Sequence, residues 1–245
     1  MNAGISLLAA VSGYLAGSIP FAILVMRTFG KGKKLDETSL PVRGTDEAIR
    51  SSAVSATAIR LQLGSRYGCL TSILDMAKAA GVTVAFKLAY PGDPFFLVAS
   101  GFAVVGHIWP IFHAFRGGRG QSPAIGGLFV VDWPTPLLIY PLAQGLGILT
   151  RSRGLVGRFA PMLIASAWLW IRFRDFAFVY YGLGLFLVRV IAMRQEVKQY
   201  LQMLRKGHLR SLSDEVAMLG FDKILQGWHQ YMRRFLQRLR RSRDE

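Results

Sequence analysis

The sequence predicts an all-α, polytopic membrane protein with about seven transmembrane helices and a cytoplasmic, amphipathic C-terminal helix. Of its 245 residues, 52% are hydrophobic, and apolar runs of roughly bilayer length alternate with short polar segments. The formal net charge of +16 is concentrated in alternate polar segments, as in multi-pass membrane proteins. The expected spans are 5–26, 69–90, 95–115, 122–131, 134–150, 155–171 and 176–193.

The first run carries Gly13 and Gly17 four residues apart, a spacing typical of closely packed helices. Pro20 is expected to kink this run near its end. A polar loop is expected over 27–68. In the second run, Asp75 and Lys78 lie one helical turn apart, so we expect them to pair and to hold the shape of a nearby site.

The distribution of basic residues predicts the orientation of the chain. With the N-terminus outside, the inner segments hold every Lys and Arg except Lys78, Lys87, Arg172 and Arg174. We therefore expect a multi-pass protein of the plasma (inner) membrane with a cytoplasmic C-terminus. This charge could indicate nucleic-acid binding, but it lies between apolar runs, so membrane lipids of the anionic inner leaflet are the expected partner and no nucleic acid is expected.

Two parts of the chain differ in composition. Residues 1–207 hold the apolar runs and form the expected membrane-embedded domain, whereas 208–245 form a basic tail. In the tail, apolar residues recur at three- to four-residue spacing from Leu225 to Leu239, with arginines between them. This pattern fits a helix lying on anionic lipid, a short coiled-coil partner, or a solvated tail folded against the protein. The single cysteine, Cys69, excludes an intramolecular disulfide framework and a cysteine-rich metal site.

The stretch 116–120, Arg-Gly-Gly-Arg-Gly, is the candidate functional loop. Its glycines would leave backbone N–H groups free to converge on an anion, and Arg116 and Arg119 would add charge. The following helix would point its positive end at the same place. The alternative is a tight turn with arginines that merely obey the positive-inside rule.

Resemblance to a known family favours the phosphate-binding interpretation. The run Gly106-His107-Ile-Trp-Pro-Ile-Phe112, followed by 115–120, resembles the G-H-x-F-P-x-F…K-G-G-K-G motif of the acyl-phosphate:glycerol-3-phosphate acyltransferases (PlsY type). Residues 13–21 are similar to the family's G-Y-L-x-G-S-I-P-F, and Asp75-x-x-Lys78 fits its D-x-x-K. The resemblance covers most of residues 10–200.

The resemblance implies a membrane acyltransferase of phospholipid biosynthesis. In that family, acyl phosphate donates a fatty acyl group to the 1-hydroxyl of glycerol 3-phosphate, which yields lysophosphatidate and inorganic phosphate; no cofactor or metal is implied. The residues it assigns as catalytic are Ser51, Arg60 and His107. Those it assigns to substrate phosphate binding are Thr57, Arg116, Gly117, Gly118, Arg119 and Gly120, with Asp75 and Lys78 as structural support.

Two other motifs of the family are altered in this chain. The first, S-G-N-x-G-A-T-N-x-x-R, falls on residues 51–61, where both asparagines are alanine (Ala53 and Ala58), both glycines are serine, and the arginine is displaced to Arg60. The third, H-R-x-N-I, falls on 193–197, where only the arginine remains. Alanine offers neither the donor nor the acceptor of an asparagine.

These changes leave two classes of function open. The chain is either an acyltransferase, with the family's acceptor or a changed one, or a non-catalytic relative that binds a phosphate, an acyl ligand or a partner. Likewise, Ser51 and Thr57 fit ordinary loop capping as well as substrate contact, and His107 fits a buried, hydrogen-bonded histidine as well as a catalytic group. A small transporter fits less well, because transport sites lie near the middle of the bilayer.

Overall fold

The computed structural model describes residues 2–32, 35, 38–41, 48–150 and 153–205. The predicted tail helix over 208–245 lies outside these residues and stays a prediction. The described part is helical apart from one small hairpin. Its elements are α1 (Ala3–Gly17), α2 (Phe21–Phe29), β1 (Thr38–Pro41), β2 (Ala48–Ser51), α3 (Ala56–Leu63), α4 (Ser65–Ala89), α5 (Phe95–Ile108), η1 (Ile111–His113), α6 (Gln121–Val131), α7 (Pro134–Leu149), α8 (Arg153–Phe173), α9 (Phe176–Ala192) and α10 (Arg194–Arg205).

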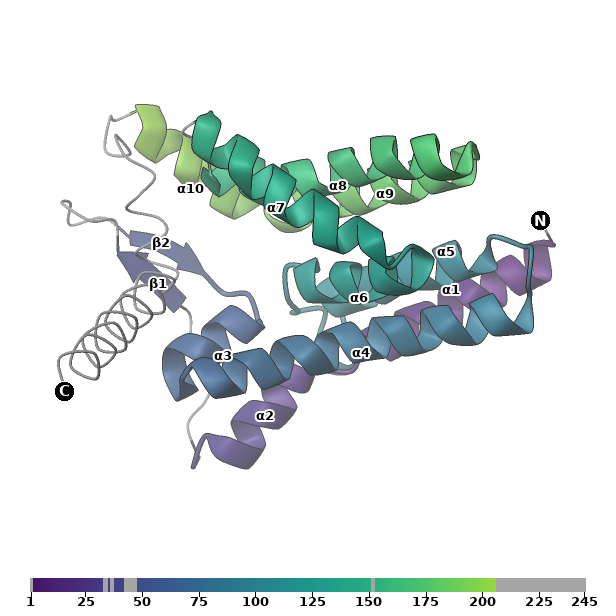
Figure 1. Cartoon of the computed structure of the whole chain (residues 1–245). Helices are drawn as coiled ribbons and strands as arrows, with labels where there is room; N and C mark the ends of the chain where they lie inside the picture. The colour runs from purple at the N-terminus through teal and green to yellow at the C-terminus, as the bar shows by residue number, and fades with distance from the viewer. Residues whose placement is uncertain (1, 33–34, 36–37, 42–47, 151–152, 206–245) are drawn as a thin grey trace, which may run out of the picture.

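The long helices form two groups (Figure 1). In one, α1 packs along α5, and α4 packs against α5, α6 and α1. In the other, α8 lies between α7 and α9. Contacts of α5 with α9 and of α6 with α7 join the groups around a buried apolar core that includes Val104, Leu128 and Leu169. The N-terminus lies at one end of the molecule, and β1, β2, α3 and α10 gather at the opposite end (Figure 1).

The predicted small-residue face on the first helix is confirmed. A Cβ at Gly13 or Gly17 would overlap the backbone oxygen of Ala99 or Ala103 on α5, so only glycine permits this approach. The Tyr14 hydroxyl also donates to the carbonyl oxygen of Trp109, at 2.8 Å. The first helix therefore supports the end of α5 from which the candidate loop emerges.

At Pro20, where the sequence predicts a kink, the structure has a full break between two helices. Helix α1 ends at Gly17 and α2 begins at Phe21, because proline lacks the N–H that a continuous helix requires. The Ile19 carbonyl in the break accepts a hydrogen bond from Lys78 Nζ, at 2.7 Å. The break thus provides a partner for a lysine that is itself almost completely buried.

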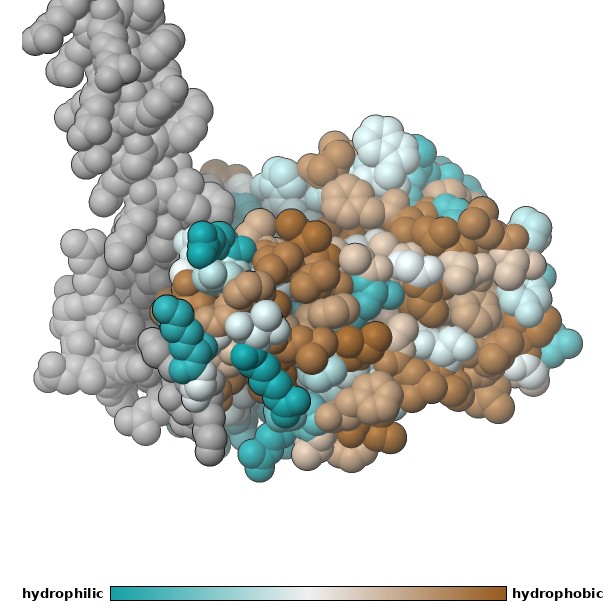
Figure 2. All heavy atoms as spheres, turned by 90° about the horizontal axis from the view of Figure 1, so that it is seen from below, coloured by the Kyte–Doolittle hydropathy of each residue, from teal (hydrophilic) through white to brown (hydrophobic). Residues whose placement is uncertain are grey.

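The surface carries many large apolar side chains. Hydrophobic residues cover much of the face shown in Figure 2, and leucines such as Leu7, Leu88 and Leu137 are more than half exposed. Among the described residues, three segments are long and apolar enough to cross a membrane, Ala3–Phe29, Ser65–Ala89 and Phe95–His113, and α6 and α9 are shorter apolar helices. The fold is therefore that of a helical membrane protein, while the count of seven spans stays a prediction.

Three sequence expectations were wrong in detail. The segment expected to be a polar loop contains an antiparallel hairpin, in which Thr38 pairs with Ser51, and the helix α3. The second apolar helix begins at Ser65, four residues earlier than predicted. The third was expected to continue through Phe115 but ends at Ile108, because Trp109 precedes Pro110 and leaves the helical region at φ −121° and ψ 69°.

Candidate functional site

A cavity of about 710 Å³ opens at the end of the molecule where β2, the loop after α5 and the start of α10 meet. Three stretches that are distant in sequence supply most of its wall. They are residues 51–54, residues from Ile108 to Arg119, and residues from Ile191 to Glu196. These stretches correspond to the three motifs singled out in the sequence, so folding brings all three to one place.

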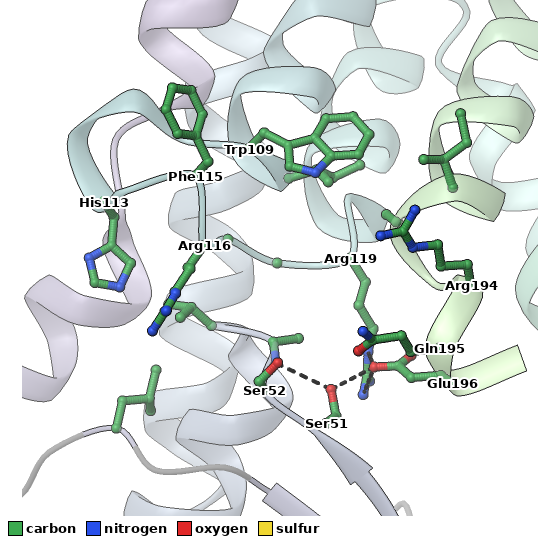
Figure 3. A pocket seen from close by; sticks show the side chains of 18 residues that line it. Ser51, Ser52, Trp109, His113, Phe115, Arg116, Arg119, Arg194, Gln195 and Glu196 are labelled. Atoms are coloured by element: carbon green, nitrogen blue, oxygen red, sulfur yellow. Dashed lines mark hydrogen bonds and ion pairs between the residues drawn. The ribbon is translucent and has the colours of Figure 1, made fainter. Parts of the chain in front are cut away.

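One ion-paired group links the three stretches. The Ser51 hydroxyl donates to Glu196 Oε1 at 2.5 Å, and Arg119 Nε donates to the same oxygen at 2.9 Å, with Arg119 Nη2 also 2.9 Å away in an ion pair. Figure 3 shows these three side chains together on one side of the cavity. Ser51 is 6% exposed and lies at the end of β2, so the hairpin fixes where its hydroxyl points.

The cavity is rich in positive charge. Arg116, Arg119 and Arg194 line it, and Glu196 is the one acidic residue among the described residues of its wall. Arg116 lies well apart from Arg119 and Glu196 in Figure 3. Burial lowers the pKa of the Arg119 guanidinium below its ordinary value, an effect that Glu196 opposes. Because arginine remains charged even so, the cavity favours anions.

The glycines of the candidate loop serve close packing more than bare-amide binding. A Cβ at Gly117 would overlap the carbonyl oxygen of His107, and a Cβ at Gly118 would overlap the His107 ring. The Gly118 N–H donates to the His107 carbonyl at 3.1 Å, and the Gly117 carbonyl accepts from Val54 N–H at 3.0 Å.

The Gly118 N–H is therefore not available to an anion. The Arg116 N–H is also engaged, by the carbonyl of His113. The binding of a phosphate by the rest of the loop stays a prediction, and the arginine side chains of the cavity wall add positive charge for it. Gly120 adopts a left-handed conformation with φ 74° at the start of α6 and does not line the cavity.

Behind the loop lies a buried polar cluster. Lys78 Nζ is 2.8 Å from Asp75 Oδ1 and 3.1 Å from His107 Nδ1, and His107 Nδ1 is 3.3 Å from the same carboxylate oxygen. The predicted pairing of Asp75 with Lys78 is confirmed. His107 lies between this cluster and Gly118 and is not part of the cavity wall, so its geometry fits support of the loop better than contact with substrate.

Other predicted site residues take different positions. Thr57 and Arg60 lie on α3 and are absent from the cavity wall. Ser55 caps α3 by accepting a hydrogen bond from Ala58 N–H, and Arg60 packs against Gly68. Sequence analysis noted that Arg194 remains in the third motif but assigned no role to Arg194 or Glu196. The signal that could have identified Glu196 is its departure from the asparagine of that motif.

Comparison with known proteins agrees with the family resemblance found in the sequence. A sequence model described as glycerol-3-phosphate acyltransferase matches residues 7–203. The chain is 34% identical over 168 residues to the glycerol-3-phosphate acyltransferase of Maricaulis maris, covering 67% of this chain and 71% of that protein. Two crystal structures of PlsY, an integral membrane glycerol 3-phosphate acyltransferase, resemble the fold. They are the glycerol 3-phosphate form (TM-score 0.66, 22% identity) and the lysophosphatidic acid form (TM-score 0.64, 20% identity), and each comparison covers 84% of this chain and 94% of the other.

Proposed function

The chain belongs to the glycerol-3-phosphate acyltransferase family, and we propose that it transfers a fatty acyl group from acyl phosphate to the 1-hydroxyl of glycerol 3-phosphate. The products are lysophosphatidate and inorganic phosphate. The observation that carries the proposal is the convergence of the three motif stretches on one cavity that holds three arginines.

The charge of the cavity suits this chemistry. Donor and acceptor each bring a phosphate, and Arg116, Arg119 and Arg194 provide separate positive groups within one wall. Acyl phosphate is already activated, so the protein has mainly to position the two substrates and to stabilise developing charge. Trp109, Ile108 and Phe115 add apolar surface to the same wall, as an acyl chain requires.

We further propose that the cavity faces the cytoplasm of a cell whose plasma (inner) membrane holds the protein, with the N-terminus outside. The start of α1 lies at the end of the molecule opposite to the cavity (Figure 1). The cavity end carries many of the described cations, among them Arg27, Arg66 and Lys198, which favours the inner side. Phosphorylated acceptors are found on that side.

The alternative is a relative that binds these ligands without turnover. Ala53 and Ala58 favour it, because the family pattern has a hydrogen-bonding asparagine at each position. We expect the purified full chain to release inorganic phosphate from palmitoyl phosphate only when glycerol 3-phosphate is added. A folded preparation that binds palmitoyl phosphate but shows no acceptor-dependent release would contradict the proposal and support the alternative.

A further inference from the structure

The two oxygens of the Glu196 carboxylate have very different surroundings. Oε1 accepts from the Ser51 hydroxyl and from Arg119 Nε, and it forms an ion pair with Arg119 Nη2. Oε2 is buried and has no hydrogen-bond partner among the residues that the structure describes. A buried acceptor atom without a partner is costly, and such atoms in native proteins often meet a ligand. Because Glu196 lies on the cavity wall, the ligand in question is the one that enters this cavity.

The chemistry of Oε2 restricts which ligand group can meet it. An ionised carboxylate only accepts hydrogen bonds, so its partner must donate one. A fully ionised phosphate ester and a carbonyl oxygen cannot do so, but an alcohol can. Of the reacting groups in the proposed function, only the acceptor hydroxyl fits. At this position the family pattern has asparagine, which can donate and accept but cannot take up a proton.

We propose that Glu196 is a catalytic residue of this chain, whose Oε2 binds the acceptor hydroxyl and takes its proton during acyl transfer. This inference rests on the proposed function. The hydroxyl oxygen forms a bond to the acyl carbonyl carbon, and the bond from that carbon to the bridging phosphate oxygen breaks. The leaving phosphate keeps that electron pair, and the hydroxyl proton moves to Oε2. The product phosphate or solvent then removes the proton, which restores the carboxylate.

The neighbouring groups fix the orientation of the Glu196 carboxylate. Arg119 approaches Glu196 from the loop before α6, and Ser51 approaches it from β2. The positive charge of Arg158 on α8 lowers the pKa of Arg119 in turn. Glu196 also lies in the first turn of α10, where the positive end of the helix favours a carboxylate. With Oε1 held by Arg119 and Ser51, the orientation of Oε2 is defined before substrate arrives.

The test compares Glu196→Gln, Glu196→Asp and Glu196→Ala with the unchanged chain in the palmitoyl phosphate assay. Glu196→Gln keeps the size and removes the base, so kcat should fall by about 100-fold or more, while KM for palmitoyl phosphate changes less than about threefold. Glu196→Asp should keep measurable activity, and added formate should restore part of the activity of Glu196→Ala. The matched control is Asp93→Asn, an exposed carboxylate outside the cavity wall, which should leave kcat unchanged.

The outcomes separate this inference from the proposed function. An inactive unchanged chain would overturn both. An active unchanged chain whose Glu196→Gln variant keeps kcat within about threefold would overturn only the role of Glu196. A Glu196→Gln variant that loses kcat and binds palmitoyl phosphate at least tenfold more weakly would also overturn it, because the residue would then support the site as a whole. Gel filtration and thermal unfolding confirm that each variant is folded.

Discussion

The Lys78 ammonium lies 2.8 Å from the Asp75 carboxylate at a position where both side chains are almost inaccessible, with exposed fractions of 3% and 2%. The pair is completed by the Ile19 carbonyl, which is available only because Pro20 breaks the first helix. His107 joins the same cluster and packs directly behind Gly118. The break at Pro20 is therefore connected to the loop of the candidate site by contacts through Lys78, Asp75 and His107.

We predict that Lys78→Met destabilises the protein by about 3–5 kcal/mol, because it leaves the Asp75 charge buried without its partner. Thermal or denaturant unfolding in detergent would measure the loss. The comparison is Arg172→Ala at the ion pair with Asp132, where the arginine side chain is 46% exposed and the buried carboxylate keeps the Thr135 hydroxyl as a hydrogen-bond donor, so the loss should be smaller. Equal losses in the two variants would show that burial of the first pair is unimportant.

Gly118→Ala should reduce activity at least tenfold, since its Cβ would overlap the His107 ring and the loop that carries Arg119 would have to shift. The quantity to measure is kcat/KM in the phosphate-release assay. Gly184→Ala provides a matched control, because a Cβ there meets nothing within 4 Å and alanine favours a helix by roughly 0.5–1 kcal/mol. A fully active Gly118→Ala variant would mean that the loop tolerates displacement.

Arg119→Ala should weaken phosphate binding by about 1.5–3 kcal/mol, which corresponds to roughly 10- to 150-fold, because charge-assisted hydrogen bonds are lost. Titration with inorganic phosphate or glycerol 3-phosphate measures this effect. Arg119→Lys restores the residue of the family motif but cannot reproduce the two contacts with Glu196, so it should recover only part of the affinity. Unchanged affinity in Arg119→Ala, with the exposed Arg205→Ala as control, would remove Arg119 from the binding site.

Restoring the two asparagines of the first motif should have opposite effects. Ala53 lines the cavity and is partly exposed, so Ala53→Asn is expected to be tolerated and to raise affinity for the acceptor by a few fold. Ala58 is 1% exposed within α3, and an amide there would be buried without an evident partner, which costs about 1–3 kcal/mol. Unfolding and acceptor titration of the two single variants would reveal the contrast. A stable, more active Ala58→Asn variant would contradict it.

Local features of the sequence predicted much of this structure. Gly13 and Gly17 predicted close helix packing, Pro20 predicted a kink where the structure has a break, and the spacing of Asp75 and Lys78 predicted their pairing. Each of these depends on a few neighbouring residues and on the period of a helix.

Features that depend on contacts between distant residues could not be predicted from local sequence patterns. Glu196 meets Ser51 across 145 positions, and the hairpin that presents Ser51 lies in a segment with no clear strand pattern. The loop glycines were expected to free backbone amides for an anion, and the need for close packing at Gly117 and Gly118 was not foreseen. The structure shows that His107 occupies the space that side chains would need.

The most direct test of the account supplies the full chain with palmitoyl phosphate and carbon-13-labelled glycerol 3-phosphate and follows the products by mass spectrometry. The account predicts labelled palmitoyl lysophosphatidate in equal amount to the inorganic phosphate released. Release of phosphate with free palmitate in place of the labelled product, or no reaction in a folded preparation, would contradict it.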